Sequence, residues 1–227
     1  SITRNPGDEK LYLKFGSISA DADFLSPEIT SLYTHAAFNN QYNVSMEVFP
    51  ISPMNAFGGV LGYDLTDRVR VKTGLYQLSS TRTDFNRKGW DFTTTSDNGL
   101  LEFIQFDGTI GEIADSLDIC PPDDHTFSRH AYNCEGVEHV INELPSGSWQ
   151  VGVFFSQDEK VQDERKSNNG MYANITLPVE LGVGAGHRFW ASGVYGFHPN
   201  INPLPLWLGG GFISQGIFEK RPLDLLI

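Results

Sequence analysis

The stretch Asp67 to Gln77, D-R-V-R-V-K-T-G-L-Y-Q, alternates between two kinds of side chain. In an extended chain, successive side chains point to opposite faces. One face of this strand would carry Val69, Val71, Thr73 and Leu75, and the other would carry Arg68, Arg70 and Lys72. A soluble two-layer protein turns such a charged face to water, whereas a membrane barrel turns the apolar face to lipid and the charged face to an aqueous lumen. The fold therefore depends on what covers the apolar face.

Composition favours an all-β protein. The chain has 227 residues, of which 19% are charged and 12% are aromatic, and it contains 23 glycines. Few charges, many aromatic residues and frequent glycine are typical of strands joined by turns rather than of helices. The length allows one large β domain or two small ones, and it allows a buried core without support from disulfides.

The charge balance argues against a nucleic-acid partner. The formal net charge is −12 at pH 7, whereas binding to phosphates needs clustered Lys and Arg. No apolar run is long enough for a transmembrane helix, but that test does not detect barrel strands of about ten alternating residues. The first residue is Ser1 and no signal peptide precedes it, so we expect the chain to start after a cleavage or inside a longer protein.

Further segments predict strands by the same alternation: 9–16, 56–65, 100–107, 149–156, 171–177, 181–197 as a hairpin, and 206–218. The turn at 64–67 is short and the connection at 78–99 is long and polar, an alternation typical of outer-membrane barrels. The charged segment 156–170 is interpreted as a solvated loop. Residues 28–49 have no clean period and are either a loop folded into a pore or a surface excursion.

Cys120 and Cys134 flank a polar loop rich in Pro and Asp. A disulfide between them explains this close spacing better than metal ligation, which favours C-x-x-C or regularly spaced His. Such a bridge implies an oxidising compartment.

Signals for catalysis and metal binding are weak. His125 with Asp123 and Asp124 has the chemistry of a metal site, and Asp115 and Asp118 add carboxylates, but the regular spacing of a calcium loop is absent. A polar extracellular loop explains these residues more simply. The sequence contains no G-x-S-x-G, H-E-x-x-H or P-loop motif, so we predict neither an enzyme, nor a cofactor, nor a metal site.

Four collinear segments, 13–24, 85–101, 170–177 and 206–224, resemble motifs of the carbohydrate-selective porin family of the OprB type. The segment 206–224 is similar to the family's glycine-rich strand and G-x-x-x-x-R-x-x-D turn, which here fall on Gly216, Arg221 and Asp224. Segments 13–24, 85–101 and 170–177 resemble three further family motifs in the same order. Lys220 departs from the family's usual Gly, and the cysteine loop is an insertion.

The resemblance implies a transmembrane antiparallel up-and-down β-barrel, with sixteen strands in the whole protein. At about ten residues a strand, this chain supplies only about eight to ten strands. We therefore expect residues 1–227 to be a single barrel domain that is incomplete at both ends. The implied function is passive, selective diffusion of mono- and oligosaccharides across the outer membrane of a Gram-negative-type bacterium, in contact with membrane lipid and with association into homotrimers left open.

The resemblance also implies pore-lining roles for several residues. Arg68, Arg70 and Lys72 would donate hydrogen bonds to sugar hydroxyls, Glu102 would accept them, and Trp90 would stack on a sugar ring. The alternatives are an unselective field that attracts anions for the basic row, and a salt bridge to that row for Glu102. For Trp90 the alternative is an anchor at the membrane interface, a role equally open to Trp149, Trp190 and Trp207.

The rival fold is a soluble, secreted β-sandwich that binds glycans, a lectin-like module. It shares the strand alternation, the disulfide and the aromatic content. The two folds differ in the apolar face, which a sandwich buries against a second sheet and a porin exposes to lipid.

Overall fold

The computed structural model describes residues 2–4, 10–35, 55–78, 99–111, 147–157, 159–161, 164–181, 186–200, 202, 204–217 and 225–227. Its strands are β1 (Ile2–Arg4), β2 (Leu11–Ile18), β3 (Ala56–Thr66), β4 (Val69–Leu78), β5 (Gly99–Ile110), β6 (Gly147–Gln157), β7 (Glu159–Val161), β8 (Glu164–Lys166), β9 (Asn169–Val179), β10 (Gly186–Gly196), β11 (Leu206–Gln215) and β12 (Leu225–Leu226). Two short 3-10 helices, η1 (Ala20–Ala22) and η2 (Glu28–Leu32), follow β2. None of the described helices has the length and hydropathy needed to cross a membrane.

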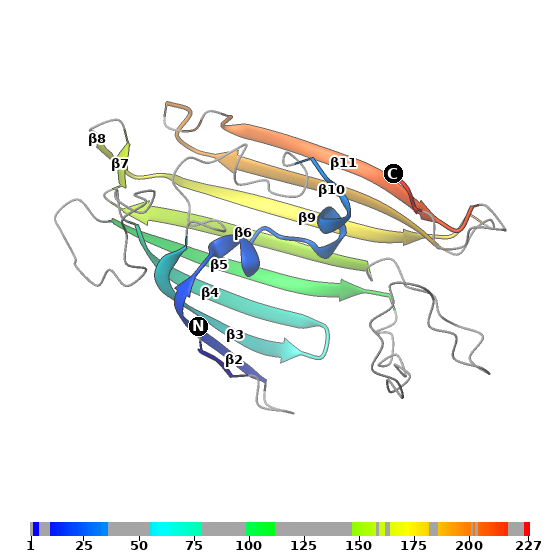
Figure 1. Cartoon of the computed structure of the whole chain (residues 1–227), viewed down its shortest axis with the longest axis horizontal. Coiled ribbons are helices and arrows are strands. Elements are labelled where there is room, and N and C mark those ends of the chain that lie inside the picture. Colours follow the sequence, from blue (N-terminus) through cyan, green and yellow to red (C-terminus); the bar gives the residue numbers. More distant parts are fainter. Residues whose placement is uncertain are drawn as a thin grey trace, which may run out of the picture.

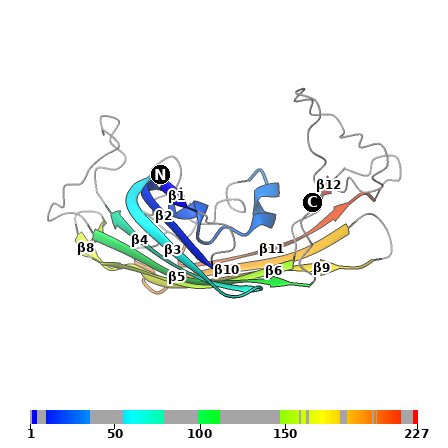
Figure 2. The ribbon, with the colours of Figure 1, turned by 90° about the horizontal axis from the view of Figure 1, so that it is seen from below.

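The strands form one antiparallel sheet in the order β1-β2-β3-β4-β5-β6-β9-β10-β11-β12. Each strand pairs with its neighbour in sequence, apart from β7 and β8, which form a separate two-stranded sheet inside the segment expected to be a plain solvated loop. The large sheet curves into a shallow trough (Figures 1 and 2). In the described part of the chain its two edge strands, β1 and β12, do not pair with each other. The prediction of an all-β, up-and-down antiparallel sheet is confirmed.

The connection between β5 and β6 does not follow the expected alternation of short and long connections. The short turn Asp67–Arg68 joins β3 to β4 at what we call the turn end of the sheet. Val69 pairs with Gly108, and Ile110 pairs with Gly147, so the ends that flank residues 111–146 lie at this same turn end. From the sequence, we interpret the metal-candidate residues of this segment as part of an extracellular loop. Residues 112–146 lie outside the described residues, but both flanking strand ends lie beside the short β3–β4 turn.

The outer, convex face of the sheet is apolar and exposed. Directly paired residues in an antiparallel sheet share a face, so the pairing assigns each side chain. Every long strand contributes at least one large apolar side chain that is exposed on this face, for example Phe15, Leu61, Leu75, Ile104, Val151, Met171, Phe189 and Leu208. A soluble protein would cover an apolar face this large, because exposed apolar patches mark binding or membrane surfaces.

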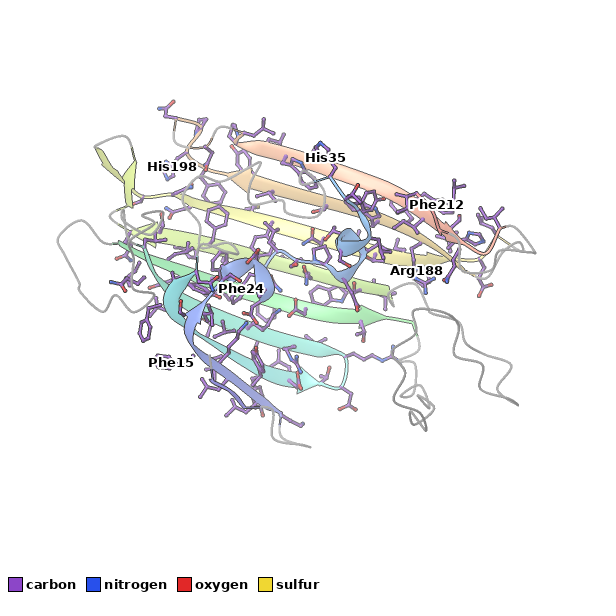
Figure 3. The ribbon with its side chains drawn as sticks, viewed as in Figure 1. Phe15, Phe24, His35, Arg188, His198 and Phe212 are labelled. Carbon is purple, nitrogen blue, oxygen red and sulfur yellow. The ribbon has the colours of Figure 1, made fainter. Side chains whose placement is uncertain are left out.

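The concave face is covered in part by residues 19–33, which we call the inner segment (Figure 2). Phe24 lies over the sheet (Figure 3), stacked on Phe103 with ring centroids 4.7 Å apart and edge-on to Tyr76 at 6.3 Å. Farther along, Trp190 Nε1 donates to the Tyr33 hydroxyl at 2.6 Å. The inner segment therefore crosses the wall from β2 to β10. Of the two interpretations of residues 28–49, inward folding holds for the described part, 28–35.

Gly74 shows why the inner segment fits closely against the wall. A Cβ at this position would come within 2.5 Å of Phe24 Cε2, and Phe24 is fully buried. Leu25 next to it has a positive φ of 52°, an uncommon conformation for a residue other than glycine. Its backbone N–H is held by the side chain of Gln105 at 3.1 Å. Backbone conformation and packing against the wall thus both fix the position of Phe24 and Leu25.

Candidate functional site

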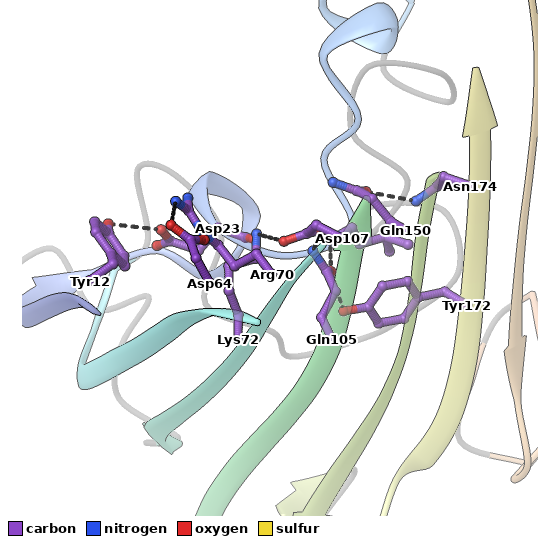
Figure 4. Close-up of polar contacts among 11 residues, drawn as sticks. Tyr12, Asp23, Asp64, Arg70, Lys72, Gln105, Asp107, Gln150, Tyr172 and Asn174 are labelled. Atoms are coloured by element: carbon purple, nitrogen blue, oxygen red, sulfur yellow. Dashed lines mark hydrogen bonds and ion pairs between the residues drawn. The ribbon is translucent and has the colours of Figure 1, made fainter. Parts of the chain in front are cut away.

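Polar side chains from successive strands meet in one row on the concave face, which we call the polar ladder (Figure 4). Arg70 pairs with Asp107 and Lys72 pairs with Gln105 in the β4–β5 register, so these four side chains share the inner face. Lys72 Nζ lies 2.9 Å from Asp107 Oδ2. Arg70 contacts Asp64 on β3 with two nitrogens, at 2.5 Å and 3.0 Å. Each of the two cations on β4 therefore has a carboxylate partner on a neighbouring strand.

Asp23 of the inner segment joins the ladder at the β2 side. Lys14 Nζ lies 2.8 Å from Asp23 Oδ2, and the Tyr12 hydroxyl donates to Asp23 Oδ1 at 3.3 Å. Lys72 Nζ donates to the backbone carbonyl of Asp23 at 2.5 Å and lies 5.6 Å from the centre of the Phe24 ring. The inner segment is thus bonded to the wall by charged as well as apolar contacts.

Gln105 is the centre of the ladder and is fully buried. Its Oε1 accepts from the Leu25 N–H at 3.1 Å and from the Tyr172 hydroxyl at 2.5 Å, while its Nε2 donates to Asp107 Oδ1 at 2.5 Å. A buried amide that satisfies this many partners holds its neighbours in one arrangement. Gln105 therefore orients both the Asp107 carboxylate and the inner segment.

Beyond Gln105 the ladder continues with uncharged groups. Asn174 Nδ2 donates to Gln150 Oε1 at 3.1 Å, and the Ser192 hydroxyl donates to Asn174 Oδ1. Charged pairs thus occupy β2 to β5, and amides and hydroxyls occupy β6, β9 and β10. The wall offers alternating hydrogen-bond donors and acceptors across its width.

The basic row predicted from the sequence divides into two parts. Arg70 and Lys72 lie on the inner face as predicted, but both are ion-paired, so their field is largely neutralised by Asp64 and Asp107. This pairing disfavours the alternative of an unselective field that attracts anions. Arg68 lies in the exposed turn rather than on the strand, beside an open groove described below.

Glu102 lies on the opposite face from the rest of the predicted pore lining. It pairs with Leu75 and Phe155, both exposed on the outer face. The prediction that Glu102 lines the pore, and the alternative of a salt bridge to the basic row, are therefore wrong. In the described part of the long strands, Glu102 is the one Asp, Glu, Lys or Arg on the outer face. It lies near the end of the sheet opposite the turn end, beside Gln77 and Gln157, where polar side chains resume.

The tryptophans also differ from expectation. Trp190 is 1% and Trp207 6% exposed, and both lie on the inner face, paired with Thr176 and Val194. They are core residues, and the interpretation of these two as membrane-interface anchors is wrong. Trp149 lies on the outer face near the turn end, opposite Gly108, where an anchor is expected.

Several predicted residues lie outside the described residues: Trp90, the pair Cys120 and Cys134, and the metal candidates Asp115, Asp118, Asp123, Asp124 and His125. Their predictions stay predictions. Across the described ranges, no group of three or more His, Cys, Asp or Glu side chains is arranged to hold a metal ion.

Sequence reasoning missed the carboxylates of the ladder and Gln105. Asp64 was not recoverable from the turn alone, because equal spacing from the Asp67–Arg68 turn would place Leu65 opposite Arg70. An irregularity in pairing between Asp64 and Thr66 shifts the register by one residue and brings Asp64 opposite Arg70. The place of Asp107 on the inner face follows from the strand alternation once the register of β5 against β4 is known. Asp23 was not recoverable, because its contacts depend on a segment that leaves the sheet and returns across it.

Comparison with known proteins agrees with this architecture. The sequence matches the family described as carbohydrate-selective porin, OprB family, over residues 1–226. The fold resembles the high-pH structure of Pseudomonas putida OprB, with a TM-score of 0.67 and 14% sequence identity, over 98% of this chain and 50% of that chain. The chain thus spans about half the length of that structure. Among curated proteins, no match was found.

Proposed function

Because the chain belongs to the carbohydrate-selective porin family, OprB, we propose that it forms part of the wall of an outer-membrane channel for passive diffusion of sugars. The family consists of channels rather than enzymes, and an outer-membrane location in a Gram-negative-type bacterium goes with it. The open sheet and the match to half of a longer porin support completion of the barrel by further strands. An open strand edge in lipid would leave backbone groups unsatisfied.

The observation that carries the proposal is the division of the sheet into two faces. The outer face carries exposed Leu, Ile, Val, Met and Phe side chains along eight long strands, and the inner face carries the polar ladder. A lectin-like sandwich would cover the outer face with a second sheet, and the described part of the chain contains only the small β7–β8 sheet besides this one. Lipid contact on the outside and solute contact on the inside fit a barrel wall.

The ladder suits neutral polyhydroxyl solutes. Two ion pairs link adjacent strands, Lys72 with Asp107 and Arg70 with Asp64. The wall therefore offers many hydrogen-bond donors and acceptors with little net charge. A sugar hydroxyl is both donor and acceptor, so it can exchange with water at each rung. Contacts of this kind are weak and numerous, as passage through a channel requires.

The proposed partners are mono- and oligosaccharides and outer-membrane lipid, with homotrimer formation retained as a prediction. The inner segment sets how wide the passage is at its depth, because it lies against the wall from Phe24 to Tyr33. Longer oligosaccharides should therefore pass more slowly than hexoses.

The test is single-channel conductance of the full-length protein in planar bilayers, with glucose and longer oligosaccharides titrated in. Lys72→Met removes a charged donor from the ladder and should weaken sugar-dependent block about tenfold, since a charge-assisted hydrogen bond contributes about 1.5–3 kcal/mol. Leu75→Ala, on the lipid-facing side of the same strand, is the matched control and should leave block unchanged. A wild-type protein that conducts ions without any response to sugar would contradict the proposal.

A further inference from the structure

An open groove lies at the turn end of the concave face, separate from the inner segment. It has a volume of about 550 Å³ and is formed where β2 and β6 begin, where β5 ends, and by the β3–β4 hairpin. Its polar lining includes Lys10, Asp64, Arg68, Arg70, Ser148 and Gln150. A volume of this size is typical of small-molecule sites in proteins.

The centre of the groove is the ion pair of Asp64 and Arg70. Two of the five N–H groups of the guanidinium contact the two carboxylate oxygens, at 2.5 Å and 3.0 Å. The Asp64 side chain remains 32% exposed and the Arg70 side chain 46% exposed. The N–H groups of Arg70 that point away from Asp64, and the remaining lone pairs of Asp64, therefore face the groove. A donor and an acceptor are therefore presented side by side in a fixed geometry.

That arrangement matches two neighbouring hydroxyl groups on a carbon chain. One hydroxyl can donate to the Asp64 carboxylate while the next accepts from the Arg70 guanidinium. Around this pair, Ser148 supplies a hydroxyl, and Gln150 supplies an amide N–H₂ that makes no hydrogen bond within the described residues. The groove thus has further groups for the other hydroxyls of a bound ring.

We propose that this groove is a second binding site for a monosaccharide, in which Asp64 and Arg70 together recognise a vicinal diol. The proposal rests on the proposed function and adds a site at one end of the passage. Short turns of bacterial barrels face the periplasm, so the sugar would reach this site last on its way inward. The Asp64–Arg70 pair is thus the part of the polar ladder that opens into the groove, and a weak site there lets solute leave as readily as it enters.

The test measures binding of glucose and its monodeoxy analogues to the full-length protein in detergent micelles by saturation-transfer NMR. If Asp64 and Arg70 recognise a diol, at least one deoxy analogue should bind wild type about fivefold to tenfold more weakly than glucose. Asp64→Asn, which removes the carboxylate of the pair, should abolish that discrimination. Arg70→Gln, which removes the guanidinium, should abolish it as well. Leu75→Ala, on the outer face of β4, should preserve it.

Glu102→Gln is the control for charge removal, because it makes the same change of carboxylate to amide on the outer face, away from the residues that line the groove. Resistance of the folded barrel to denaturation by detergent, compared among all variants, checks that each is folded. Equal discrimination in wild type and in both ion-pair variants would overturn the proposal, as would loss of discrimination in Leu75→Ala. Hexose flux into liposomes, measured in parallel, distinguishes failure of this site from failure of the channel function, which would abolish flux in wild type.

Discussion

Replacing Phe24 with alanine should release the inner segment from the concave wall. Phe24 is fully buried, stacks on Phe103 at 4.7 Å, and lies 5.6 Å from the Lys72 ammonium. Truncating a buried phenylalanine typically costs about 3–5 kcal/mol. We take about 3 kcal/mol, because one side of the segment borders the lumen and water can enter the space left behind. At about 1.4 kcal/mol for each factor of ten, docking of the segment should weaken about 100-fold.

The assay is amide hydrogen exchange of the full-length protein in micelles, followed by mass spectrometry of the peptide that covers the inner segment. The Leu25 N–H, bonded to Gln105, reports docking directly. Its protection should fall about 100-fold in Phe24→Ala, and the strand amides of β5 should keep theirs. Phe15→Ala, which truncates a half-exposed ring on the outer face, is the matched control and should not alter exchange in the segment. Unchanged protection of Leu25 in Phe24→Ala would refute the role assigned to this ring.

Three further outcomes are expected. Gly74→Ala should loosen the inner segment and increase current noise, because its Cβ would lie 2.5 Å from Phe24. Gly59→Ala, whose Cβ would meet no atom closer than 3.5 Å, should leave the noise at the wild-type level, and equal noise in the two variants would count against the close fit. Glu102→Leu should keep wild-type conductance and sugar block, since this side chain faces outward; altered ion selectivity would return Glu102 to the lumen. An epitope inserted within 112–146 should be reached by antibody from the same side of the membrane as one inserted at Asp67, and labelling from opposite sides would contradict the strand topology.

Strand positions were largely predictable, and the reason is the outer face. Positions that face lipid must be apolar, whichever residues lie on the inner face. Every second residue of each strand therefore follows a continuous apolar pattern. Val71 and Leu75 on β4 are an example, and the segment predicted around them matches β4 closely. A short turn between β3 and β4 was also predicted, at 64–67, and the structure has it at Asp67–Arg68, because β3 continues to Thr66.

The inner face was harder to predict because it is partly dry. On β5, Leu101 and Phe103 lie under the inner segment and are fully buried, while Leu100 and Ile104 face outward. Both faces of this strand are therefore largely apolar, so the charge of Glu102 was a prominent feature of its sequence. Assigning it to the lumen assumed that charge marks the wet face throughout. Near Phe24 that assumption fails, since the inner segment has turned part of the lumen wall into a core.

The contact between Tyr33 and Trp190 has a consequence for assembly. These two residues are separated by 157 positions, yet the Trp190 indole donates to the Tyr33 hydroxyl, and their rings pack edge to face at 5.3 Å. The docking surface for the inner segment thus exists only after β10 has joined the sheet. Contacts between residues so distant in sequence form late, because the intervening chain must first be ordered. The passage should therefore be wide while the wall is being built and should reach its final bore only in the last stage of folding.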